Sequence, residues 1–352
     1  MKNHTTTAAV LSMCVFSLLL LGASCTLKGS SDTVLQTSNK GKTWESKSLV
    51  KGGGGKMFRL TTANASLIRV NPKNSLNLFL GTHDQGLFAS DTAASNWTQM
   101  IASQEVVDLA LDPTARCTMY VAMPAKVFRT VNCAESWESI YNETRKTRIT
   151  SIALDSADPM IIYVATDAGD LFKSINQGMS WSSSYHLDGS LFSKVLIDAT
   201  DTAIVTLITS DSHVIRSYNK GSTWSDITPS FEIQRRRGNF VASQSSGKKE
   251  GLFLVTTDGI WKLQSAQEWI FIPPLTPIGT AQIRAGVMNA QNEHELYYAT
   301  KNTFYHSTDN GIHWTAYALP TSRWPSVLTI DPNNPSILYM GLQKEMERNP
   351  YL

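Results

Sequence analysis

The feature that most constrains this chain of 352 residues is an eight-residue pattern that recurs along almost its whole length. The clearest copy occupies residues 307–314 and follows the scheme Ser/Thr-x-Asp/Asn-x-Gly-x-Ser/Thr-Trp. Good copies also stand at residues 37–44, 130–137, 174–181 and 217–224, and eroded ones near 91–97 and 264–269. Seven tryptophans stand at 44, 97, 137, 181, 224, 269 and 314, so the intervals are 53, 40, 44, 43, 45 and 45. A period near 44 residues predicts a repeat architecture.

Each slot of the pattern has a physical role in a tight turn. An Asp or Asn side chain can bond the backbone two residues on, and the leading hydroxyl does so more weakly. Glycine accepts a positive φ, and tryptophan then opens the next strand with a large buried ring. The carboxamide and tryptophan slots are filled by Asn39 and Trp44, Asn132 and Trp137, Asn176 and Trp181, Asn219 and Trp224, and Asp309 and Trp314.

This pattern resembles the Asp-box, also called the BNR repeat, which closes a hairpin between two antiparallel strands. We therefore expect the ten residues above to be structural. Metal binding is disfavoured, because most copies carry neutral Asn where an oxygen-rich calcium site would want charge.

The sequence between boxes predicts four strands per repeat and no helix. Residues 149–185 read as strand, turn, apolar strand, turn, third strand, box and fourth strand. The first unit begins at its third strand, near Val34, and the last stops after its second, near Gly341. Two strands from each end complete one sheet, which removes exposed sheet edges. The expected fold is an all-β, seven-bladed propeller over residues 32–352, its closing blade shared by both ends of the chain.

The amino terminus reads as an export signal over residues 1–24, with Lys2 before an apolar stretch. Cys25 follows small residues and resembles the lipidated cysteine of bacterial lipoproteins, although Gly22 stands where that pattern prefers Leu. Residues 25–31 would then be a linker from a lipid anchor. Plain secretion and an uncleaved anchor are the alternatives, so we expect an exported protein: anchored to the cell or outer membrane, periplasmic or secreted.

Cys117 and Cys133 lie near each other in the predicted hairpin, with Cys133 two residues beyond register. An exported protein permits a disulfide between them. The alternative is a pair of unbonded thiols.

Basic residues gather in the predicted loops between blades, on the rim opposite the boxes. Those nearest the first, innermost strands are the expected binding residues: Arg148, Lys194, Arg235, Arg236, Arg237, Arg284 and Arg323. Aspartates in the remaining loops of that rim would surround them. Such a face could select and orient an acidic segment of a partner; an ordinary solvated rim is the alternative.

Single-domain, exported propellers with this repeat resemble the photosystem II stability and assembly factor family. That resemblance implies a seven-bladed propeller with an arginine-rich face that binds partner proteins. Carried over by position, the face falls on the arginines just named, although the loop before Val106 contributes Glu105 instead of a basic residue. We expect a monomeric, non-catalytic assembly or scaffold factor without a cofactor, whose partner is a protein, such as a membrane protein or one with an acidic segment. Photosynthesis cannot be inferred.

The alternatives are a glycoside hydrolase of sialidase or xyloglucanase type and a carbohydrate- or peptide-binding propeller. Sialidases resemble six-bladed propellers with an Arg-Ile-Pro segment, which is absent, and glycosidases need two opposed carboxylates. Xyloglucanase-like enzymes pair two propellers around a cleft. Sortilin-like peptide receptors are larger and carry cysteine-rich modules. Nucleic acid is not expected, because the net charge is only +2 and the chain is exported.

Overall fold

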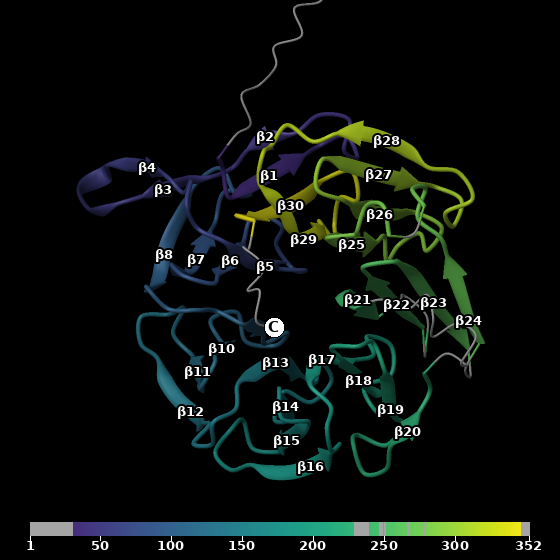
Figure 1. Ribbon diagram of the computed structural model, residues 1–352. Coiled ribbons are helices and arrows are strands. Elements are labelled where there is room, and N and C mark those ends of the chain that lie inside the picture. Colours follow the sequence, from purple (N-terminus) through teal and green to yellow (C-terminus); the bar gives the residue numbers. More distant parts are fainter. Residues whose placement is uncertain are drawn as a thin grey trace, which may run out of the picture.

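Seven β-sheets pack around a central axis and form a propeller (Figure 1). The computed structural model describes residues 31–228, 239–245, 249, 251–265, 268–277 and 279–345. The predicted export signal and Cys25 lie outside the described residues. No helix within these ranges is long and apolar enough to cross a bilayer. The predicted fold class, seven antiparallel four-stranded blades, is confirmed.

Each blade runs outward from an innermost first strand to an exposed fourth strand. Blade 1 contains β5 (Ala65–Val70), β6 (Leu78–Thr82), β7 (Gly86–Ser90) and β8 (Trp97–Ala102). Blade 2 contains β9 (Asp108–Leu111), β10 (Met119–Ala122), β11 (Lys126–Thr130) and β12 (Glu138–Asn142). Blade 3 contains β13 (Ile149–Leu154), β14 (Ile162–Thr166), β15 (Asp170–Ser174) and β16 (Ser182–His186).

The remaining blades repeat this order. Blade 4 contains β17 (Phe192–Ile197), β18 (Val205–Thr209), β19 (Val214–Ser217) and β20 (Ser225–Asp226). Blade 5 contains β21 (Phe240–Ser245), β22 (Leu252–Thr256), β23 (Gly259–Ser265) and β24 (Glu268–Ile272). Blade 6 contains β25 (Ala285–Met288), β26 (Leu296–Ala299), β27 (Thr303–Ser307) and β28 (Thr315–Ala318). Every residue of β14, β18 and β22 is buried, because blades cover both faces of these second strands.

The seventh blade closes the ring with strands from both ends of the chain. Its order is β2 (Glu45–Ser46), β1 (Val34–Thr37), β30 (Leu338–Gln343) and β29 (Trp324–Ile330). Strand β1 pairs with β30 in antiparallel register, so the first and last strands lie side by side (Figure 1). This closure agrees with the predicted division of strands.

The long interval after the first tryptophan is not the flexible glycine loop that its composition suggests. Strands β3 (Leu49–Lys51) and β4 (Met57–Arg59) form a hairpin, with a 3-10 turn at Gly53–Gly55. Strand β3 also pairs in parallel with β8, so blade 1 has six strands. The hairpin projects from the side of the ring (Figure 1). Backbone pairing with β8 therefore orders an insertion that the sequence marks only by its glycines.

The repeated turn is held by the same hydrogen bonds in each good copy. In blade 3 the Ser174 hydroxyl donates to Asn176 Oδ1 at 2.9 Å and accepts from the Gly178 amide at 2.8 Å. Asn176 Oδ1 also accepts from the Ser180 amide at 2.9 Å. The equivalent bond to the carboxamide or carboxylate slot joins Thr43 to Asn39, Ser136 to Asn132, Thr223 to Asn219 and His313 to Asp309. These residues therefore serve as turn formers.

The tryptophan of the turn contacts the preceding blade as well as its own hairpin. Trp181 donates through Nε1 to the carbonyl of Ile140 in blade 2, at 2.8 Å, and its ring packs against Tyr141. Trp97 and Trp269 likewise donate to Lys47 and Ile227. Other tryptophans pack without such a bond, since the buried Nε1 atoms of Trp44, Trp137 and Trp314 lack a partner among the described residues. The repeated ring thus links successive blades.

Two cysteines brace the second blade. A disulfide joins Cys117 to Cys133, and the Cys133 amide also donates to the Cys117 carbonyl at 3.1 Å. The neighbouring register places Met119 opposite Thr130. The bridge therefore ties the loop between the first two strands of the blade to its turn motif.

Candidate functional site

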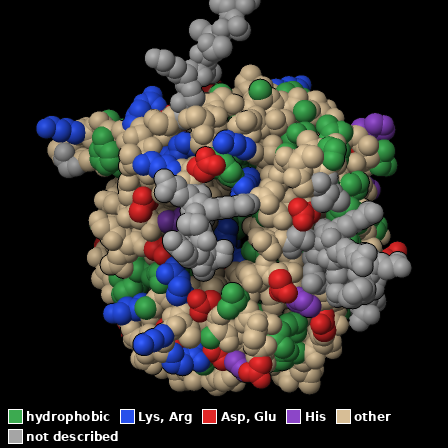
Figure 2. All heavy atoms as spheres, viewed as in Figure 1, with side chains coloured by type: hydrophobic (Ala, Val, Ile, Leu, Met, Phe, Trp, Pro, Cys, Tyr) green, Lys and Arg blue, Asp and Glu red, His purple; other side chains and the backbone are tan. Residues whose placement is uncertain are grey.

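The first strands of all seven blades enclose a cavity on the propeller axis. Its volume is about 320 Å³. Turn motifs lie on one rim of the ring and the loops between blades lie on the other, because neighbouring strands alternate in direction. We call the second the inter-blade rim. Lysine and arginine side chains lie among acidic ones on the face shown in Figure 2.

The predicted binding residues that the structure describes do not form one continuous patch. Arg148 lies exposed on the inter-blade rim, just before β13, and pairs with Glu105 at 2.7 Å. Arg284 lies just before β25, with its guanidinium 4.2 Å from the centre of the Trp324 ring. Lys301 approaches the same ring at 4.7 Å. Arg235, Arg236 and Arg237 lie outside the described residues.

Arg323 is buried, contrary to the expectation of an exposed basic residue. It is only 6% exposed, and it donates to the carbonyls of Ser31, Thr61 and Ala63. It also donates to Asn64 Oδ1 at 2.9 Å. Burial lowers the pKa of Arg323, while the charges of Asp84 and Asp32 oppose that shift. Its guanidinium therefore holds the amino-terminal segment against blade 1, because so many backbone acceptors converge on it.

Charged residues beside Arg148 are largely neutralised by one another. Arg145 pairs with Glu143 at 2.8 Å and with Asp170 at 2.6 Å. Hydrogen bonds from Arg145 lower the pKa of Glu143 to about 2 against the effect of burial. His186 lies between Asp188 and Asp170, whose hydrogen bonds raise its pKa. Because its guanidinium is paired with two carboxylates, Arg145 contributes little unopposed positive charge to this part of the rim.

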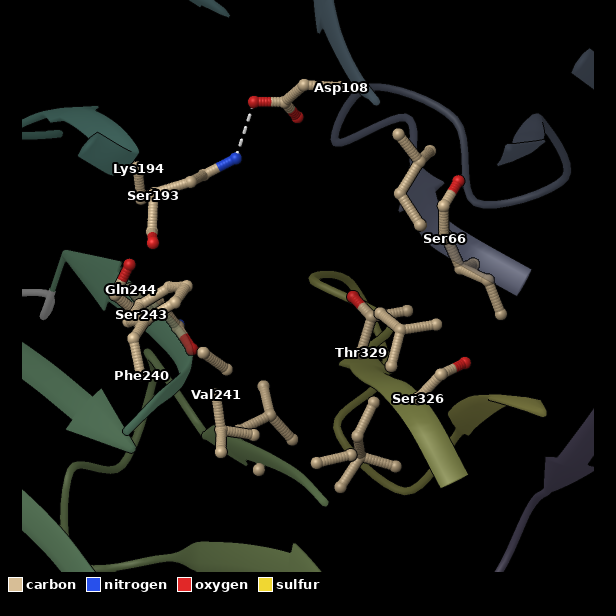
Figure 3. A pocket seen from close by; sticks show the side chains of 18 of the residues that line it. Ser66, Asp108, Ser193, Lys194, Phe240, Val241, Ser243, Gln244, Ser326 and Thr329 are labelled. Carbon is tan, nitrogen blue, oxygen red and sulfur yellow. Dashed lines mark hydrogen bonds and ion pairs between the residues drawn. The ribbon is translucent and has the colours of Figure 1, made fainter. Parts of the chain in front are cut away.

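Lys194 lies inside the cavity rather than on the rim. It stands in the middle of β17, and its Nζ is 2.6 Å from Oδ2 of Asp108, the first residue of β9 (Figure 3). Arg69, in β5, donates to the other oxygen of the same carboxylate at 2.9 Å. Asp108 also accepts hydrogen bonds from the Ser151 hydroxyl and the Ile152 amide. One buried carboxylate therefore links four successive blades.

The ionisation of this cluster follows from its contacts. Burial alone would raise the pKa of Asp108, but Lys194 and Arg69, with hydrogen bonds from Lys194 and Ser151, hold it at about 2. Burial lowers the pKa of Lys194, the nearby Arg69 adds to that effect, and the Asp108 carboxylate opposes it. We infer that Asp108 is charged at neutral pH, since the four donors just named and the Leu109 amide converge on it. With Arg69 and Lys194 also charged, the cluster has a net charge of +1.

Sequence reasoning missed Arg69 and Asp108. Arg69 follows Leu67 and Ile68 in an apolar strand, and Asp108 stands between Val107 and Leu109. A charged residue inside a strand expected to be innermost needs a buried partner. That signal was present, but it could not say which blades would supply the partner.

No group of three or more His, Cys, Asp or Glu side chains able to hold a metal ion occurs among the described residues. Asp108 is the single carboxylate that lines the axial cavity within the same part of the chain. The cavity is therefore chemically a cationic site with one internal counter-ion.

The sheet topology and axial cavity define the protein as a seven-bladed propeller. Its sequence matches the model of the DUF6242 beta propeller domain over residues 116–345, and the chain belongs to that family. No curated protein sequence matches the chain.

Solved structures with the same fold include both enzymes and binding proteins. The GH74 xyloglucanase from Xanthomonas campestris is 17% identical, with a TM-score of 0.66 over 80% of this chain and 51% of the enzyme. YCF48 from Cyanidioschyzon merolae is 11% identical, with a TM-score of 0.63 over 79% of this chain and 95% of YCF48. YCF48 bound to D1 peptide is 12% identical, with a TM-score of 0.61 over 81% of this chain and 94% of YCF48. The chain spans about half the length of the xyloglucanase, and identities this low establish the fold alone.

Proposed function

We propose that this propeller is a non-catalytic, protein-binding assembly or scaffold factor, exported and held at a membrane by a lipid on Cys25. The observation that carries the proposal is the distribution of cations on and beneath the inter-blade rim. Arg69, Arg148, Lys194 and Arg284 come from four different blades and lie on the cavity wall or at the rim. Such an arrangement suits an acidic segment that lies across several blades.

Solved structures with the same fold support such a role. One of them, YCF48, has been seen with a bound D1 peptide, and nearly its whole length aligns with this chain. A propeller of this size can therefore bind a peptide without a second domain. A photosynthetic partner does not follow for this chain.

The chemistry of the cavity supports binding over glycoside hydrolysis. A glycosidase needs two carboxyl groups, and its general acid needs a raised pKa. Asp108 instead has a pKa of about 2 and is engaged by two cations. Purified protein assayed on a glycan panel that includes xyloglucan is expected to release no sugar. Turnover that survives repurification would favour the enzyme alternative.

The rim proposal is tested by charge reversal. The variants are Arg148→Glu and a triple change of Arg235, Arg236 and Arg237 to Glu. We expect each to weaken capture of partners from the native membrane fraction, and capture by the wild type to fall at high salt. Arg116→Glu is the matched control, because Arg116 is exposed in the loop between β9 and β10, on the opposite rim. Unchanged capture by both charge-reversal variants would remove the basis for the proposal.

The anchor would lie close to the same rim. Arg323 binds Ser31 beside the inter-blade rim, and Cys25 is six residues before Ser31. An extended linker of that length reaches about 20 Å. Labelling with a radioactive fatty acid, followed by membrane fractionation, should show loss of both label and membrane association in Cys25→Ala. Equal membrane association of the variant would exclude this anchor.

A further inference from the structure

The axial cavity contains hydrogen-bond donors that the protein itself does not satisfy. Arg69 uses one terminal nitrogen on Asp108 and makes no other hydrogen bond to the described residues. Lys194 donates only to Asp108 within that same set, which leaves two ammonium protons unbonded. The Ser243 hydroxyl, from β21, is buried without a hydrogen-bond partner in the described part of the chain. Only the Ser243 hydroxyl is fully buried, and an unpaired buried donor is costly. The side chains of Lys194 and Arg69 are 18% and 37% exposed, so their free N–H groups are open to a ligand that enters the cavity.

The two sides of the cavity differ in chemistry. Lys194 and Asp108 lie on one side, while Val241 lies on the opposite side (Figure 3). Val287 and Leu328 add apolar side chains from β25 and β29, beside the polar Ser326 and Thr329. A fitting ligand therefore has an anionic end and a small apolar body.

The charge of the cluster limits the anion further. The charges of Arg69 and Lys194 exceed that of Asp108 by one, so a single negative charge neutralises the site. A guanidinium offers a planar pair of N–H groups that matches a carboxylate. A phosphate dianion would leave the site with a net negative charge. The cavity of about 320 Å³ is at the small end of the range for ligand pockets.

We propose that the axial cavity is a binding site for a carboxylate with a short apolar body. Arg69 and Lys194 bind the carboxylate, Ser243 donates a hydroxyl, and Asp108 positions both cations as an internal counter-ion. The ligand is either a small organic acid or the carboxyl terminus of a peptide, since both present the same group. Arg69 and Lys194 also belong to the cations on which the proposed function rests, but ligand binding in the cavity is measured without any partner protein. Failure of the cavity proposal therefore leaves the rim proposal, tested at Arg148, standing.

Isovalerate is a suitable probe, and isovaleramide is its neutral counterpart. Isothermal titration and thermal unfolding at constant ionic strength should show saturable binding and stabilisation by isovalerate but not by isovaleramide. Inorganic phosphate should bind more weakly than isovalerate. No stabilisation by isovalerate beyond that of chloride, or tighter binding of phosphate, would overturn the proposal.

Two cavity variants and one surface variant locate the site. Arg69→Gln and Ser243→Ala should each weaken isovalerate binding about tenfold or more, because each removes a donor to a charged group. Ser243→Ala should leave the unliganded protein at least as stable as the wild type, because it removes an unsatisfied buried hydroxyl. Arg116→Gln, on the exposed surface, should bind like the wild type. Undiminished binding by Ser243→Ala and Arg69→Gln would place the ligand elsewhere.

A peptide arm distinguishes the two sources of the carboxylate. Acetyl-Ala-Val with a free carboxyl terminus is compared with its amide. Tighter binding of the free acid than of isovalerate assigns the site to a chain end. Binding of isovalerate without the peptide assigns it to a small acid. Binding of the amide as tightly as the free acid would contradict carboxylate recognition.

Discussion

At the scale of single residues, Asp108 shows how a strand residue becomes a junction between blades. It opens β9, yet its partners lie on β5, β13 and β17. Its carboxylate compensates the largely buried Lys194 ammonium and also pairs with the partly exposed Arg69 guanidinium. A buried ion pair is weak evidence for stability by itself, but removal of one partner is costly. The negative charge of Asp108 therefore serves both roles: it stabilises the junction between blades and it positions the two cations proposed to bind a ligand.

Replacement of Asp108 by Asn should destabilise the protein at neutral pH by about 3 kcal/mol or more, because Lys194 loses its buried counter-ion. The folded-state pKa of Asp108, about 2, lies below its usual value of 3.8. Its ionisation thus adds roughly 2 kcal/mol of stability above pH 4. That contribution should disappear as the pH falls from about 4 to about 2.

Urea unfolding of the wild type and the variant across this range measures the difference directly. We expect the gap between the two free energies of unfolding to narrow with falling pH. A gap that stays constant would show that the Asp108 charge does not stabilise the fold.

At the scale of elements, the repeated turn tolerates exchanges that keep its hydrogen bonds. In blade 1 the Ala94 amide donates to Ser90 and the Asn96 amide donates to Thr92, so a hydroxyl replaces the carboxamide. A copy that looks eroded in sequence thus keeps the same turn. Asx turns also close the loops after several first strands, as where Asp155 Oδ1 accepts from the amides of Ala157 and Asp158. That second repeat was missed, because a lone Asp before a polar loop is common in sequence.

The glycine slot allows a matched pair of substitutions. Gly178 has φ +88°, and a Cβ there would stand 2.5 Å from Ile140 in the neighbouring blade. Gly178→Ala should therefore cost at least about 1–2 kcal/mol. Ala134 fills the same slot in blade 2 with φ 68°. Ala134→Gly should raise stability by several tenths of a kcal/mol, since relief of strain exceeds the added chain entropy.

Thermal and urea unfolding of both variants would measure the two changes. If both substitutions changed the free energy of unfolding in the same direction, this slot would not require a left-handed backbone conformation.

The disulfide of blade 2 joins two cysteines that are 16 residues apart in the sequence and so closes a loop in the unfolded chain. The entropy of that loop in the unfolded chain predicts a loss of about 3 kcal/mol when both cysteines are replaced by Ser. Calorimetry of the Cys117→Ser, Cys133→Ser variant, beside wild type treated with a reductant, measures the loss. Reduced wild type should unfold like the variant, and an unchanged unfolding temperature in both would mean that the bridge adds nothing.

At the scale of the whole molecule, closure of the ring depends on one pairing of distant strands. Strand β1 lies between β2 and β30, so the carboxyl-terminal strands can complete a blade only when the amino-terminal segment is in place. Arg323, the residue before β29, stabilises this arrangement because it donates hydrogen bonds to the carbonyls of Ser31, Thr61 and Ala63. Arg323, which the sequence suggested as a binding residue, thus helps to close the ring of blades.

Replacement of Arg323 by Gln should lower the free energy of unfolding by about 3 kcal/mol, because several buried carbonyls lose their donor. Hydrogen exchange of the amides in β1 should accelerate more than exchange in β14, which lies across the ring. Arg116→Gln serves as the surface control and should change stability by less than about 0.5 kcal/mol. Uniform acceleration throughout the ring would argue against a local role in closure.

The repeat, the seven blades and the shared closing blade were all available from the sequence, because they depend on local turn chemistry and on spacing. A period near 44 residues and a tryptophan per repeat leave few other architectures. The hairpin at residues 49–59 could not be predicted from the sequence, since its strands are held in place by the pairing of β3 with β8. Arg323 was misplaced for a similar reason: sequence position beside a first strand does not state whether a side chain turns outward or into a blade junction.

The amino-acid sequence by itself determined how each blade is built, since its turns and apolar strands are set by neighbours a few residues apart. Only the tertiary structure decided which charged residues meet. Arg69, Asp108 and Lys194 are separated by whole repeats and come together because the ring brings their first strands to one axis. Their pairing depends on distances between blades, and no local pattern of residues encodes those distances.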